Sequence, residues 1–97
     1  MRFRSKKKQA AYVKERVPLV KQMLEEQPIC MRCRTNPSDD VHEIVSRARG
    51  GSITDRANLT CLCRRCHSWV TAHPKEAEAE GWSAPSWERD QYTTREA

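Results

Sequence analysis

Apolar residues recur at helical spacing near the start of the chain. The stripe consists of Val13, Val17, Val20, Met23 and Leu24. Pro18 interrupts this stripe, and proline suits the first turn of a helix but not its interior. The pattern therefore predicts a helix over residues 18–26, with a weaker turn before it, inside an N-terminal helical segment of residues 9–28.

The middle of the chain has the pattern of two short strands. Residues 40–45 (DVHEIV) and residues 58–63 (NLTCLC) are typical of strands, and the pair Gly50 and Gly51 breaks regular structure between them. A helix is expected over residues 65–72, directly after the second strand.

A second short helix is expected after this one. Pro74 can occupy its first turn and Gly81 can end it. The aromatic residues Trp82 and Trp87 follow, and we expect both to pack back on the domain. Stacking of these rings on nucleic-acid bases is the less favoured alternative.

Composition limits the class of protein. The chain has 97 residues, of which 37% are hydrophobic and 32% charged, so a single domain with a thin core is expected. Chains of this kind often need a metal or a partner. No apolar run approaches the roughly 18–20 residues of a membrane helix, and the basic N-terminus lacks the apolar part of a secretory signal. We therefore expect neither a membrane protein nor a secreted precursor, with no membrane partner, and not a large independent enzyme.

Charge is concentrated at the N-terminus. Residues 1–21 hold eight Lys and Arg against one acid, within a net charge of +5. Such a segment is typical of proteins that bind nucleic acid, although a solvated tail is the alternative. Residues 1–8 are expected to be a disordered basic arm that binds nucleic acid through Arg2, Arg4, Lys6, Lys7 and Lys8.

Four of the five cysteines form two pairs with equal spacing. They are Cys30 with Cys33 and Cys63 with Cys66. Two such knuckles supply the four thiolates of a structural Zn²⁺ site, whereas two disulfides would leave an odd cysteine. The odd residue, Cys61, is expected to be a buried apolar residue, with replacement of Cys63 as a ligand as the alternative.

The two knuckles would clamp the base of the strand pair and the start of the helix. This arrangement brings His42 and His67 into range of each other. The pair could hold a second divalent metal against a phosphate. Basic loop residues would hold the nucleic-acid backbone: Arg47, Arg49 and Arg56. The alternative is that both histidines are hydrogen-bonded structural residues.

Taken together, these motifs resemble the HNH endonucleases with a ββα-metal fold, of the four-cysteine type common in bacteriophages. The resemblance covers about residues 29–73. It is carried by Cys30-x-x-Cys33, VHEIV, Arg47-Ala-Arg-Gly50-Gly51, Asn58-Leu59 and Leu62-Cys63-Arg-Arg-Cys66-His67. It implies a small zinc-stabilised α+β domain with an extra N-terminal helix and a C-terminal helical extension over residues 74–97.

The resemblance also implies roles for the site residues. His42 and His67 would be ligands of the catalytic metal, and Asn58 would brace the loop. Glu43 stands where the family usually has a histidine as general base, and a carboxylate is the weaker base near neutral pH. The alternative is that His42 itself is the base, with Glu43 or Asp40 assisting the metal.

The function implied is hydrolysis of DNA phosphodiester bonds with Mg²⁺, Mn²⁺ or Ni²⁺. The setting implied is phage genome packaging in the bacterial cytoplasm, with terminase subunits as partners. The alternatives are a non-catalytic zinc-ribbon DNA-binding module and a packaging adaptor. The set His42, Asn58 and His67 distinguishes them, because binding alone does not require it.

Overall fold

A short antiparallel strand pair lies at the centre of the fold. The computed structural model describes residues 6–94. Strand β1 (Asp40–Glu43) pairs with β2 (Leu59–Leu62), and His42 stands opposite Thr60. Both strands fall within the predicted segments.

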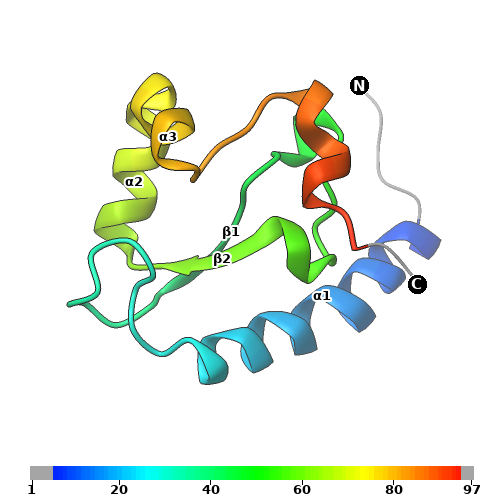
Figure 1. Ribbon diagram of the computed structural model, residues 1–97. Helices are drawn as coiled ribbons and strands as arrows, with labels where there is room; N and C mark the ends of the chain where they lie inside the picture. Colours follow the sequence, from blue (N-terminus) through cyan, green and yellow to red (C-terminus); the bar gives the residue numbers. More distant parts are fainter. Residues whose placement is uncertain (1–5, 95–97) are drawn as a thin grey trace.

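Helices cover this strand pair on two sides. Helix α1 (Lys6–Glu26) lies along one side, and α2 (Arg64–Ala72) and α3 (Pro74–Glu80) lie on the other (Figure 1). A 3₁₀ segment, η3 (Ser86–Tyr92), follows α3. The result is a small α+β domain with a strand–strand–helix centre, as the sequence predicted.

Helix α1 is longer than predicted and runs through Pro18. The predicted start near Pro18 is wrong because both Pro18 and Lys14, four residues before it, are exposed. The Lys14 carbonyl that loses its N–H partner can therefore bind water instead. Residues 6–8, which were expected to be disordered, are also helical, while Arg2 and Arg4 lie outside the described residues.

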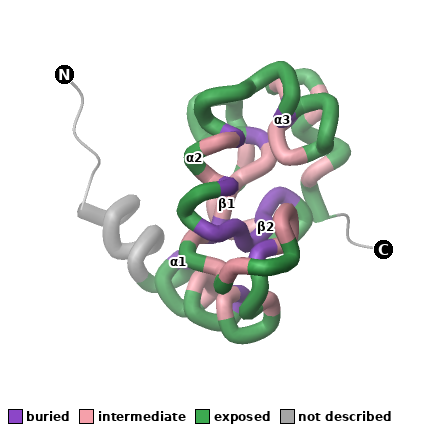
Figure 2. Tube along the Cα trace, turned by 90° about the vertical axis from the view of Figure 1, so that its left-hand side faces the viewer, coloured by how far each residue is buried: buried purple, intermediate pink, exposed green. Residues whose placement is uncertain are grey.

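Two apolar clusters share the strand pair. Buried residues concentrate on and around it, between α1 and α2 (Figure 2). The cluster under α1 consists of Met23, Val41, Leu59 and Cys61. The cluster under α2 and α3 consists of Cys30, Leu62, Cys63, Cys66, Val70 and Ala77. All four residues of β2 are buried because that strand serves both clusters.

The segment after α3 returns to the strands. Gly81 ends α3 in the left-handed conformation, with φ of 87°, as predicted. Trp82 packs against the cluster under α2, but Trp87 is 83% exposed, so its predicted packing is wrong. Backbone bonds such as Ala84 N–H to the Ile44 carbonyl (2.9 Å) hold this segment, and they do not require the Trp87 ring. None of the described helices is long and apolar enough to cross a membrane.

Candidate functional site

Four cysteine sulfurs form the candidate metal centre. The Sγ atoms of Cys30, Cys33, Cys63 and Cys66 all lie within 4.8 Å of one another. The Sγ atoms of Cys33 and Cys63 are 3.9 Å apart. Four sulfurs at about 2.3 Å from a tetrahedral Zn²⁺ would be about 3.8 Å apart. The donor set and its spacing therefore fit zinc, as the sequence predicted.

Backbone N–H groups of each knuckle point at the sulfurs. Cys33 donates to Cys30 Sγ (3.5 Å), and Cys66 donates to Cys63 Sγ (3.4 Å). Burial raises the pKa of Cys30, but backbone N–H groups outweigh it and lower the pKa to about 6. Burial raises the pKa of Cys66 to about 12, against the opposing hydrogen bond from Arg32. Zinc must therefore displace protons when it binds this group.

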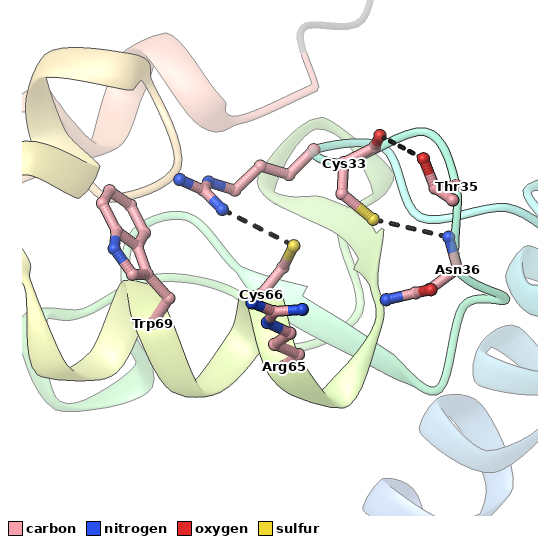
Figure 3. A pocket seen from close by; sticks show the side chains of 7 residues that line it. Cys33, Thr35, Asn36, Arg65, Cys66 and Trp69 are labelled. Carbon is pink, nitrogen blue, oxygen red and sulfur yellow. Dashed lines mark hydrogen bonds between the residues drawn. The ribbon is translucent and has the colours of Figure 1, made fainter.

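A pocket over the knuckles is organised around Arg32. Its guanidinium donates to Cys66 Sγ (3.6 Å) and to Glu80 (3.1 Å), and its carbon lies 3.7 Å from the centre of the Trp69 ring. Figure 3 shows Trp69 and Cys66 on the wall of this pocket. The Trp69 ring also stacks on His73, with ring centroids 5.0 Å apart. A four-thiolate zinc site carries a net charge of −2, and Arg32 is placed to offset part of it.

Cys61 stands apart from the metal centre. Its side chain is fully buried in the cluster with Met23 and Val41, and burial raises its pKa. The expected assignment of Cys61 as a core residue, with Cys63 in the metal group, is confirmed.

His42 on β1 and His67 at the start of α2 come together, as the topology predicted. Their ring centroids are 5.0 Å apart, with an edge-on angle of 67°. His67 directly follows Cys66, so the knuckle fixes its backbone. Asp40 lies two residues before His42 on the same strand face and binds His67.

Each histidine ring has one nitrogen engaged by an acceptor. His42 Nε2 lies 2.6 Å from the Trp82 carbonyl oxygen, and His67 Nδ1 lies 3.1 Å from Asp40 Oδ2. Burial raises the pKa of Asp40, but Arg64 and His67 outweigh it, so the pKa lies below its usual value and the carboxylate is ionised. Carbonyl and carboxylate oxygens only accept, so both engaged nitrogens carry hydrogen. In the neutral rings, His42 Nδ1 and His67 Nε2 therefore keep lone pairs.

Burial also controls the protonation of His42. It lowers the pKa of His42, and the hydrogen bond to the Trp82 carbonyl only partly opposes this effect. His42 is therefore neutral near pH 7, the form that can bind a metal or accept a proton. An N–H donated to a backbone carbonyl or a carboxylate is the usual support of a metal-binding histidine.

Glu43 is directed away from the histidine pair. Neighbouring strand residues point to opposite faces, and Glu43 faces α1, where its carboxylate lies 3.7 Å from Arg16 Nη2. Arg16 is almost completely buried and also donates to the carbonyls of Val41 and Ile53. Sequence reasoning missed Arg16, although its spacing of seven residues from Met23 places it on the apolar face of the helix.

Asn58 braces the loop between the strands. Its side chain accepts from Val45 N–H (2.8 Å) and donates to the carbonyls of Val45 (2.9 Å) and Ser52 (2.8 Å). Gly51 permits this close packing, because a Cβ there would lie 1.8 Å from the Val45 oxygen. The Val45 N–H is bound by this side chain, which explains why β1 ends before the predicted residue 45.

The basic loop residues differ in their surroundings. Arg49 donates to Glu78 (3.3 Å) and to the Ala84 carbonyl (3.1 Å). Arg56 forms a two-pronged ion pair with Glu26 on α1. Arg47 is exposed and forms no ion pair with the residues that the structure describes. Among the described residues, Arg47 is thus the one of the three arginines predicted to contact DNA whose side chain forms no ion pair.

The carbonyl of Trp82, which accepts from His42, could not be found from the sequence, because every residue type carries the same backbone acceptor.

Comparison with known proteins gives one match. The family model for HNH endonuclease matches residues 30–73, which contain both knuckles and the His42–His67 pair. No curated protein and no solved structure matches the chain. Residues 30–73 are therefore similar to the HNH endonuclease family, and the same segment holds a four-cysteine group that fits zinc.

Proposed function

We propose that the protein is a metal-dependent endonuclease that hydrolyses DNA phosphodiester bonds. The observation that carries this proposal is the His42–His67 pair. Each ring donates one N–H to a fixed acceptor and, in its neutral form, has a lone pair on the other nitrogen. A module that only binds DNA has no need of two buried or half-buried histidines supported in this way.

The proposed ligands of the catalytic metal are His42 Nδ1 and His67 Nε2. Among the described residues, only the cysteine group brings three or more candidate ligands together, so water and a DNA phosphate would complete the coordination of the second metal. Imidazole ligands suit Ni²⁺, whereas Mg²⁺ and Mn²⁺ favour oxygen ligands such as phosphate and water. The metal would stabilise charge on the scissile phosphate and lower the pKa of the attacking water.

Asn58 and Glu43 are proposed to have supporting roles. The Asn58 side chain forms hydrogen bonds with backbone groups of Val45 and Ser52 and so fixes the end of β1 beside His42. Glu43 is engaged by Arg16 and faces α1, which argues against the position-based assignment of Glu43 as the general base. We propose that its main role is to tie β1 to α1.

The wider setting rests on the resemblance to phage nucleases alone. We propose phage genome packaging in the bacterial cytoplasm, with terminase subunits as partners. Co-purification of the tagged protein with the large terminase subunit tests this setting. If the association with terminase is lost in salt washes that leave DNA-binding proteins in place, the proposed packaging role is wrong.

Plasmid nicking tests the enzymatic proposal. Supercoiled DNA is incubated with the zinc-loaded protein and Mg²⁺, Mn²⁺ or Ni²⁺, and wild type is compared with His42→Ala and His67→Ala. His73→Ala is the matched control, because His73 lies at the far end of α2 and stacks on Trp69. We expect nicking only by wild type and the control. If wild type never cleaves DNA but binds it, the protein is the non-catalytic zinc module.

A further inference from the structure

A chain of hydrogen bonds joins the zinc knuckle to the His42 ring through residues after the matched segment. Arg32 reaches from Cys66 to Glu80. The same Glu80 oxygen, Oε1, accepts from the Trp82 indole N–H at 2.9 Å. The Trp82 carbonyl then accepts from His42 Nε2 at 2.6 Å. Glu80 and Trp82 both lie beyond residue 73, where the family match ends.

The Trp82 carbonyl is held in place by bonds on either side of it. Trp82 N–H donates to the Ala77 carbonyl (2.8 Å), and Ala84 N–H donates to the Ile44 carbonyl (2.9 Å). The indole bond to Glu80 fixes the side chain, which packs on the cluster around the cysteines. The carbonyl is therefore fixed relative to both β1 and the zinc knuckle.

We propose that Glu80 and Trp82 are positioning residues of the catalytic site, and that they hold His42 with its Nδ1 lone pair toward the metal. This inference rests on the proposed function. Without a fixed acceptor, a neutral imidazole can place its proton on either nitrogen and rotate about its side-chain bonds. The C-terminal extension is then part of the nuclease site, although the family match does not include it.

The exposure of Glu80 separates positioning from stability. Its side chain is 44% exposed, and ion pairs at such sites contribute little to the stability of a fold. Loss of the Glu80 carboxylate should therefore have a small effect on unfolding. The effect on the histidine should be larger, because displacement of a catalytic group by about 1 Å can cost up to about 100-fold in rate.

Four variants of the full-length, zinc-loaded protein test the inference. Glu80→Ala removes the bridge, and Trp82→Phe removes the indole N–H together with part of the ring while keeping an aromatic side chain. Glu80→Gln keeps an oxygen acceptor and should restore wild-type behaviour. Glu76→Ala is the matched control, because Glu76 is exposed on the same helix. Zinc content and thermal unfolding are measured for each variant.

The main readout is the ¹⁵N NMR spectrum of the imidazoles, without DNA or catalytic metal. We expect wild type, Glu80→Gln and Glu76→Ala to show His42 protonated on Nε2 alone near neutral pH. Glu80→Ala and Trp82→Phe should show mixed protonation of the two nitrogens. The same two variants should lose about tenfold to 100-fold in kcat for nicking, with KM for DNA unchanged.

The outcomes separate the inference from the proposed function. An unchanged His42 spectrum in both Glu80→Ala and Trp82→Phe overturns the positioning role, whatever happens to activity. A changed spectrum in a wild-type background that never nicks DNA supports the positioning role while the nuclease proposal fails. Equal losses of kcat for nicking in Glu80→Ala and Glu76→Ala would indicate a general effect on α3 and overturn the inference.

Discussion

Arg16 on α1 binds Glu43 on β1, so a helix that precedes the matched segment is tied to the residue beside His42. Arg16 also donates to the carbonyls of Val41 and Ile53. One buried guanidinium thus joins α1, the first strand and the loop that follows it. Helix α1 is by this contact a structural part of the candidate site.

Replacement of Arg16 by alanine should destabilise the protein. The change leaves the Glu43 carboxylate and two carbonyls without their donor, which costs about 2–4 kcal/mol in the free energy of unfolding. Urea unfolding followed by circular dichroism measures this cost. Lys14→Ala, on the exposed side of the same helix, should change it by less than about 0.5 kcal/mol. Equal effects of the two changes would show that the Arg16 contacts do not stabilise the fold.

Zinc content should depend on Cys63 and not on Cys61. Elemental analysis of purified protein should find about one zinc per chain, and Cys63→Ala should lose it together with the folded state. Cys61→Ala should keep the zinc and lose only about 1 kcal/mol of stability, because it removes a small buried side chain. A folded, zinc-loaded Cys63→Ala protein would contradict the assignment of the metal group.

Zinc retention should fall in acid. The pKa of Cys66 is raised to about 12 and that of Cys30 is lowered to about 6, so protons compete with zinc for the group, most weakly at Cys30. Lowering the pH adds protons to the free thiolates and therefore favours release. Release is measured with a chromogenic chelator between pH 8 and pH 4. Zinc affinity that does not change over this range would contradict the proposed proton displacement.

The acid limit of nicking should lie below pH 6.5. Burial lowers the pKa of His42 from its usual value of 6.5, and only the neutral ring has a lone pair on Nδ1. The His42 ring thus remains neutral and able to bind the metal as the pH falls through 6.5, and it loses the Nδ1 lone pair only at lower pH. A profile of kcat against pH with saturating Mn²⁺ measures this limit. Loss of kcat with a midpoint above pH 6.5 would show that another group controls the reaction.

Gly51→Ala should be more damaging than Gly81→Ala. A Cβ at Gly51 would overlap the Val45 carbonyl and approach Asn58 Nδ2 to 2.9 Å, so the loop must move. We expect a loss of about 2–4 kcal/mol, and Asn58→Ala should cost a similar amount through its lost hydrogen bonds. Gly81 has open space around it, so Gly81→Ala meets only the strain of its positive φ, about 1 kcal/mol. Thermal unfolding of the three variants tests this order.

The parts of the candidate site that depend on the spacing of side chains along the sequence were predictable. The repeated Cys-x-x-Cys pattern determined the metal group, and the position of His67 beside Cys66 brought it near His42. The Trp82 carbonyl was not predictable, because a backbone acceptor carries no signal in the sequence. The extent of α1 was not predictable either. The free-energy cost of the hydrogen bond that Pro18 removes from the helix depends on which side of the helix faces water.

The basic start of α1 provides the last prediction, on DNA binding. Lys6, Lys7 and Lys8 begin α1, so deletion of residues 1–8 would remove part of the helix together with five positive charges. Lys→Gln changes at these three positions remove charge while keeping good helix formers. If all three lysines contact phosphates, the slope of log Kd against log salt should become shallower by about 2.7, because each contact contributes about 0.9.

Fluorescence anisotropy with a labelled duplex, at several NaCl concentrations, measures this slope. Lys75→Gln on α3 is the control for a general change in net charge, and its slope should match that of wild type. Circular dichroism verifies that α1 remains helical in the triple variant. Unchanged affinity and slope in that variant would show that DNA does not contact the start of α1, and the DNA-binding surface would then have to include the exposed Arg47 instead.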